Sequence, residues 1–134
     1  MSLHRFELAF DGEPQDVGFL HGLQDIGFSS EKEARLHRPF TEFLPSPDIV
    51  PERREPLVFF FTEKGLRYFL FDIYCIAKEV EAAGWSFVYR KVNAVNDSLI
   101  RYRDEYQIAL WASDVPDEGK FTTPIAAKEF ETLI

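Results

Sequence analysis

Two pairs of histidine and acidic residues are spaced so that the side chains of each pair could coordinate a metal ion together. His21 and Asp25 are four residues apart, as are Glu33 and His37, and both pairs fall in segments with helical periodicity. Residues four apart lie on the same face of a helix. Imidazole nitrogens and carboxylate oxygens suit Zn²⁺, so the pairs would form a metal site if the two helices meet. The same spacing is common in surface contacts, and the sequence leaves both interpretations open.

Arginines in two strand-like segments form a second candidate site. Arg90, Arg101 and Arg103 could line a basic face in an otherwise acidic protein. Guanidinium groups bind carboxylates and phosphates, so this face would suit such a ligand or the protein's own acidic C-terminal third. The alternative is a solvated sheet face, neutralised by nearby acids such as Asp97 and Glu105.

Familiar enzyme signatures are absent from the sequence. It contains no Gly-x-Ser-x-Gly motif, Walker loop, dinucleotide fingerprint or Cys-x-x-Cys pair. The single cysteine, Cys75, falls inside a predicted helix rather than at a helix N-terminus, where a thiol becomes reactive. We therefore predict no catalytic residue and no cofactor. The alternative is an enzyme, or a protein that binds a small ligand or a metal, that uses His21, His37 and the basic strand face.

The periodicity of apolar residues predicts strands and helices in one domain of 134 residues. The predicted strands are residues 4–10, 57–61, 85–92 and two more within 98–111. The predicted helices are residues 16–26, 30–37, 62–83 and a last one that starts at 123 and runs to the C-terminus. This order predicts an α+β fold: a mostly antiparallel sheet of about five strands, the long helix on one face, short N-terminal helices and a C-terminal helix.

Particular residues mark where these elements begin and end. We expect Asp16 to cap the first helix, Ser30 to start the second and Pro39 to close it. Thr62 is the expected cap of the long helix, and Thr123-Pro124 has the order that starts the last. In residues 4–10, phenylalanine and leucine alternate with more polar residues, which is typical of a half-buried strand.

Residues 39–56 contain five prolines, a density that disfavours any regular element. Five apolar side chains in the same stretch argue for an ordered loop that lies across the core. The 14 phenylalanines of the chain exceed what one small core needs. Either this loop covers the surplus, or a partner surface does, and the sequence leaves both open.

Composition and charge exclude several classes of protein. The chain is 46% hydrophobic and 28% charged, which excludes a disordered chain. Its 15 basic and 23 acidic residues give a net charge of −8, which opposes binding to nucleic acid. Charged residues interrupt the longest apolar tract, so we expect no membrane span. One cysteine and no secretory leader predict a cytoplasmic protein.

Two short motifs resemble a pattern in small uncharacterised bacterial proteins that share a strand, a helix and a closing hairpin. The motifs are Phe59-Phe60-Phe61-Thr62-Glu63-Lys64-Gly65 and Asp104-Glu105-Tyr106-Gln107. The resemblance covers residues 57–110 at most. It implies a bacterial origin and carries no activity with it.

These observations favour a non-enzymatic protein-interaction module. No catalytic constellation is present, the protein is acidic, and its apolar residues exceed the needs of one core. We expect self-association first, as a homodimer. An immunity-type or inhibitor-type protein that covers a basic protein partner is a variant of this hypothesis.

Overall fold

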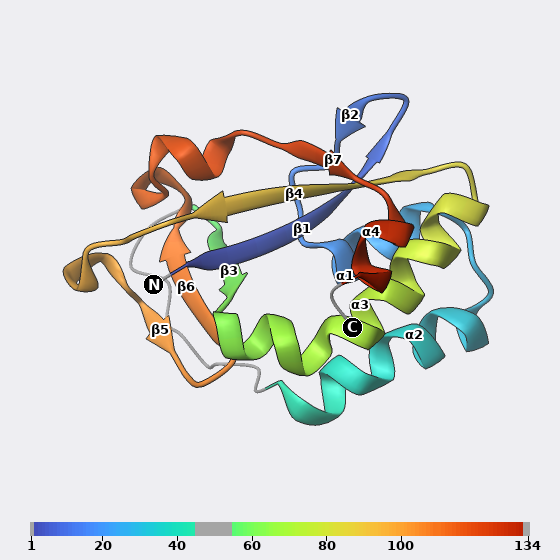
Figure 1. Ribbon diagram of the computed structural model, residues 1–134, viewed down its shortest axis with the longest axis horizontal. Helices are drawn as coiled ribbons and strands as arrows, with labels where there is room; N and C mark the ends of the chain where they lie inside the picture. Colours follow the sequence, from blue (N-terminus) through green and yellow to red (C-terminus); the bar gives the residue numbers. More distant parts are fainter. Residues whose placement is uncertain (1, 45–54, 133–134) are drawn as a thin grey trace.

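An antiparallel sheet holds together segments from the whole length of the chain (Figure 1). The computed structural model describes residues 2–44 and 55–132. Its strands are β1 (Leu3–Phe10), β2 (Glu13–Pro14), β3 (Leu57–Phe61), β4 (Ser86–Val92), β5 (Tyr102–Arg103), β6 (Gln107–Trp111) and β7 (Thr123–Ile125). They lie in the order β5-β6-β3-β1-β4-β7, and β2 pairs with β1. The predicted α+β class is confirmed, with seven described strands in place of about five.

The α-helices gather on one side of this sheet (Figure 1). They are α1 (Phe19–Gly22), α2 (Ser30–Phe43), α3 (Glu63–Ala82) and α4 (Ala127–Glu131). Short 3₁₀ turns, η1 (Leu23–Asp25), η2 (Asp97–Leu99), η3 (Ala112–Asp114) and η4 (Asp117–Lys120), lie in the connections. None of the described helices is long and apolar enough to cross a membrane.

Both faces of the sheet carry apolar cores. On the helix side, Phe6, Leu8 and Phe87 pack against α3 residues such as Phe69 and Ile73. The opposite face has a smaller core of Leu3, Phe60, Val92, Ile108, Leu110 and Val115. Strand β1 lies between β3 and β4 and is buried on both faces for most of its length, so the expectation of a half-buried strand is wrong.

The long helix begins and ends as predicted. The Thr62 hydroxyl accepts a hydrogen bond from the Gly65 N–H at 3.0 Å, and Gly84, with φ of 85°, follows the last turn. Thr62 also donates its hydroxyl hydrogen to the Glu105 carbonyl at 2.6 Å, and its N–H donates to the Tyr106 carbonyl at 3.0 Å. The segments Phe59–Gly65 and Asp104–Gln107 therefore dock on each other.

Helix α2 runs through the proline that was expected to end it. Pro39 lies inside α2, which continues to Phe43. Leu36 and Phe40 flank it on one face and are both buried in the helix-side core. Burying two such side chains contributes about 3–6 kcal/mol, enough to offset the roughly 3 kcal/mol cost of an interior proline. The expected loop 39–56 is thus helical up to residue 43, and residues 45–54 lie outside the described residues.

The C-terminal helix starts later than predicted. Thr123-Pro124 belongs to β7, where Pro124 pairs with Val88 at the edge of the sheet. An edge strand tolerates proline because one side of it needs no donor. Helix α4 begins at Ala127, whose N–H donates to the Glu81 carboxylate at 2.6 Å.

Candidate functional site

The sheet opens between its two central strands. Strands β1 and β4 share seven register pairs, whereas β1 and β3 share only the pair His4 and Phe61. Beyond that pair the backbone ladder stops, and the Arg5 side chain donates from Nη1 to the Phe59 carbonyl at 3.0 Å. A side chain therefore takes over a hydrogen bond that a neighbouring strand would otherwise supply.

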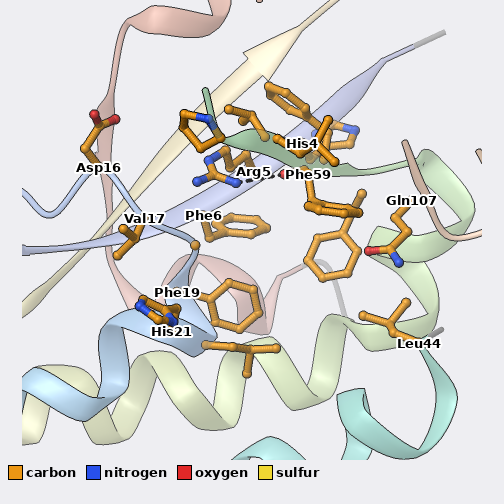
Figure 2. Close-up of a pocket in the computed structure, with 17 residues that line it drawn as sticks. His4, Arg5, Phe6, Asp16, Val17, Phe19, His21, Leu44, Phe59 and Gln107 are labelled. Carbon is orange, nitrogen blue, oxygen red and sulfur yellow. Dashed lines mark hydrogen bonds between the residues drawn. The ribbon is translucent and has the colours of Figure 1, made fainter. Parts of the chain in front are cut away.

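A cavity of about 360 Å³ lies at this opening, on the side of α1 (Figure 2). Its walls are mainly apolar and rich in aromatic rings: Phe6, Phe19, Phe59, Phe60 and Phe61, with Val17, Leu20, Leu44, Leu57 and Val58. The polar side chains of the lining are His4, Arg5, Asp16, His21 and Gln107. The volume falls in the range of small-molecule sites, and the mixture of apolar walls with a few polar groups is typical of them.

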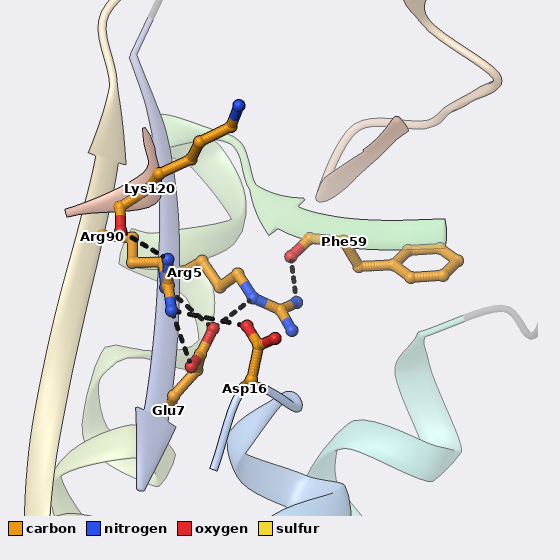
Figure 3. Close-up of polar contacts among 6 residues, drawn as sticks. All are labelled: Arg5, Glu7, Asp16, Phe59, Arg90 and Lys120. Atoms are coloured by element: carbon orange, nitrogen blue, oxygen red, sulfur yellow. Dashed lines mark hydrogen bonds and ion pairs between the residues drawn. The ribbon is translucent and has the colours of Figure 1, made fainter. Parts of the chain in front are cut away.

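A cluster of charged side chains borders the cavity through Arg5 (Figure 3). Glu7 is buried, with 1% of its side chain exposed, and its Oε2 lies 2.9 Å from Arg5 Nε and 2.9 Å from Arg90 Nε. Arg90 Nη2 donates to Glu7 Oε1 at 3.2 Å, and Nη1 donates to the Lys120 carbonyl at 2.9 Å. Asp16 Oδ1 lies 3.5 Å from Arg90 Nη2.

The sequence predicted that Asp16 caps the first helix, and this prediction is wrong. Gly18 precedes the helix, with no side-chain cap. Asp16 instead adopts a left-handed backbone with φ of 60° and turns its carboxylate toward Arg90. This ion pair forms only in the tertiary structure, because 74 positions separate the two residues in the numbering (90 − 16 = 74).

A second line of polar groups crosses the helix side of β1. His4 is 4% exposed, and its Nε2 lies 2.7 Å from Glu63 Oε1 at the start of α3. Its Nδ1 lies 2.5 Å from the Tyr89 hydroxyl on β4. The hydrogen bond with His4 lowers the pKa of Glu63. Burial raises the pKa of Tyr89 to about 12, so its phenol stays neutral.

The predicted metal ligands do not form one group. His21 lies on α1, 3.3 Å from Gln24, and Asp25 on η1 accepts a hydrogen bond from Gln15 at 2.8 Å. On α2, His37 Nε2 lies 3.9 Å from Glu33 Oε1. Nowhere in residues 2–44 and 55–132 do three His, Cys, Asp or Glu side chains lie where they could hold a metal ion together. His21 contributes to the cavity wall, and His37 does not.

The predicted basic face is split by the strand order. Arg90 lies on β4, whereas Arg103 lies on β5, and three strands separate them. Arg103 pairs with Asp97 at 3.0 Å, and Arg101 donates to the Ser98 carbonyl at 3.4 Å. Only Arg90 belongs to the charged cluster beside the cavity. The prediction that Arg90, Arg101 and Arg103 share one basic face is wrong, because β4 and β5 are not neighbours in the sheet.

Sequence reasoning missed Arg5, Glu7 and His4. Arg5 and Glu7 were placed on the polar side of a half-buried strand, which drew no attention to them. The available signal was a pair of opposite charges, Arg5 and Glu7, two positions apart in one predicted strand, together with Arg90 in another predicted strand. That signal becomes specific only when β1 and β4 are known to pair, with Arg5 opposite Arg90.

In comparisons with family models, curated proteins and solved structures, no match to the chain was found.

Proposed function

We propose that this chain is a non-enzymatic binding protein that takes a small, largely apolar molecule into the cavity between β1 and β3. The observation that carries the proposal is an aromatic-lined cavity of about 360 Å³ beside buried polar groups. At about 30 Å³ per water molecule, this space equals roughly a dozen waters. Apolar walls hold water poorly, so an apolar guest gains free energy by replacing it.

Fluorescence of N-phenylnaphthylamine, a neutral two-ring probe, tests this proposal. We expect saturable binding at one site and emission that rises as the probe leaves water. Val17→Trp adds bulk to the cavity wall and should weaken binding at least roughly tenfold. Ala34→Trp, at an exposed position on α2 that does not line the cavity, is the matched control and should change nothing. No saturable binding, or equal effects of both variants in folded protein, would overturn the proposal.

Self-association is the second candidate function, and it is favoured by exposed rings along α2 and α3. Phe43, Tyr68 and Phe71 are 53%, 51% and 60% exposed. The Phe43 and Tyr68 ring centroids lie 6.1 Å apart, and Phe71 follows Tyr68 by three residues on α3, where its ring lies 6.3 Å from Tyr74; we call these exposed rings the apolar strip. Strips of this kind commonly pack against a second copy in homodimers.

Sedimentation equilibrium over a wide concentration range tests the dimer. Phe71→Glu places a charge in the strip and should shift a dimer to monomer. Phe121→Glu is the control, because Phe121 is 74% exposed and lies outside the strip. A monomer at all concentrations would refute self-association without affecting the cavity proposal. A basic protein partner remains a further hypothesis of the same class.

A further inference from the structure

We infer that the ligand of the cavity carries an anionic group, and that this anion binds Arg5 against the repulsion of the Asp16 carboxylate, which lines the same cavity. The class of ligand is an apolar or aromatic body with one carboxylate, sulfonate or phosphate. The inference rests on the proposed cavity-binding function and specifies its substrate class.

One nitrogen of Arg5, Nη2, has no acceptor among the described residues. Its Nε faces the Glu7 carboxylate at 2.9 Å, and its Nη1 donates to the Phe59 carbonyl at 3.0 Å. No residue in the described part of the chain accepts a hydrogen bond from Nη2, and Figure 3 shows the other two nitrogens engaged. The side chain is only 11% exposed and lines the cavity. A guanidinium N–H in such a place is best satisfied by an oxyanion.

The buried part of the charged cluster has an excess of positive charge. Arg5 and Arg90 are 11% and 13% exposed, and among the residues that the structure describes Glu7 is the one carboxylate buried between them. Asp16 supplies the second negative charge, but its side chain is 90% exposed, so water screens most of its effect. A second anion brought into the cavity would balance the two guanidiniums more closely than Asp16 does.

The position of Asp16 makes its carboxylate the negative charge that opposes this anion. It lines the same cavity as Arg5, and Figure 2 shows Arg5 beside Phe6 and Phe59, with Asp16 at the edge of the site. Its ion pair with Arg90 is loose, at 3.5 Å. Because Asp16 is exposed, its carboxylate can be replaced without opening the core.

Two probes with the same rings separate the anion from the apolar body. N-phenylnaphthylamine is neutral, and anilinonaphthalene sulfonate adds one sulfonate to the same ring system. We expect the sulfonate to bind at least roughly fivefold more tightly than the neutral probe, and Val17→Trp to weaken both. Added salt should weaken only the sulfonate.

The decisive comparison is Asp16→Asn with Asp11→Asn. Both aspartates are exposed, and both have positive φ values, 60° and 53°, which asparagine tolerates. Each substitution changes the net charge by the same amount, but Asp11 does not line the cavity. Asp16→Asn should tighten sulfonate binding roughly three- to tenfold, the range for removing one partly screened charge nearby. It should leave the neutral probe unchanged, and Asp11→Asn should change neither.

The outcomes of these titrations test the binding function and the anion inference separately. If neither probe binds, the cavity-binding function fails and the inference fails with it. If both bind equally and Asp16→Asn has no effect, the function stands and the anion inference is wrong. Equal tightening by Asp16→Asn and Asp11→Asn would indicate a general charge effect and would also overturn the inference.

Competition then distinguishes an amphipathic acid from a free anion. Decanoate should displace the bound sulfonate, whereas inorganic phosphate at the same concentration should not. If phosphate displaced the sulfonate and decanoate did not, the site would bind a free anion, which contradicts the predicted ligand class.

Discussion

Replacing Glu7 with glutamine removes the one carboxylate that, within residues 2–44 and 55–132, is buried between Arg5 and Arg90. The side chain keeps its size and one acceptor oxygen, so the change acts mainly on charge. In the native protein the carboxylate lies within 2.9 Å of a nitrogen of each arginine. In the variant, two guanidiniums that are 11% and 13% exposed face each other without a buried counterion.

The expected cost follows from the burial of all three groups. Removing one partner of a buried ion pair typically destabilises a protein by about 3–5 kcal/mol, because the remaining charge is left uncompensated. Here two cations lose their shared partner, so we expect the upper part of that range. This is a large share of the ~5–15 kcal/mol that stabilises a typical domain.

Urea unfolding followed by tryptophan fluorescence measures this loss, since Trp111 is only 2% exposed in the native state. With a slope of about 2 kcal/mol per molar urea, the midpoint should fall by roughly 2 M. Glu13→Gln, at an exposed position on β2, is the matched control and should change stability by less than about 0.5 kcal/mol. A loss below about 1 kcal/mol for Glu7→Gln would refute the description of this cluster as a buried ion network.

Three further predictions concern other contacts. In Gly65→Ala the new Cβ would lie 2.0 Å from the Tyr106 carbonyl oxygen, so we expect a loss of about 1–3 kcal/mol in thermal unfolding despite the better helix propensity of alanine. The pKa of Tyr89 is raised to about 12, so its stabilising contribution is complete below pH 10 and is lost as the pH rises through 12. In an absorbance titration, Tyr89→Phe should remove a tyrosine that ionises near pH 12. The pKa of Glu63 is lowered by His4, so its contribution is present above pH 4.5 and is lost as the pH falls further; Glu63→Gln should flatten the acid limb of the stability curve.

Each of these expectations has an outcome that contradicts it. Gly65→Ala with unchanged or higher stability would show that the hairpin yields to the new methyl group without cost. If Tyr89→Phe instead removed a tyrosine that ionises near pH 10, the Tyr89 phenol would be exposed to water. An unchanged acid limb in Glu63→Gln would mean that the contact with His4 does not persist in solution.

Local patterns predicted much of the architecture. The apolar run 57–61 became the inner strand β3, and the stripe from Leu66 to Val80 became α3 with Thr62 as its cap. These predictions succeeded because periodicity and capping are properties of neighbouring residues. The errors at Pro39 and Pro124 have the opposite origin. In both places a tertiary contact, core burial of Leu36 and Phe40 or edge pairing with β4, outweighed the local preference.

The candidate site was much less predictable than the fold. The sequence singled out His21 and Arg90, which do lie beside the cavity or its charged cluster, but for ligand groups that do not form. It gave no weight to Arg5 or Glu7. Whether a strand charge faces water or a second charged strand depends on strand order, and that order is set by contacts between distant segments.

The sequence by itself determined the class of fold, the long helix and its ends, and the acidic balance of the chain. These depend on composition and on spacings of a few residues, which the chain carries wherever it folds. Only the tertiary structure decided that β1 lies between β3 and β4, that the sheet opens after His4, and that Arg5, Glu7 and Arg90 meet there. The physical reason is that a cavity and a buried ion network are formed by side chains from separate strands, and no local pattern specifies which strands will become neighbours.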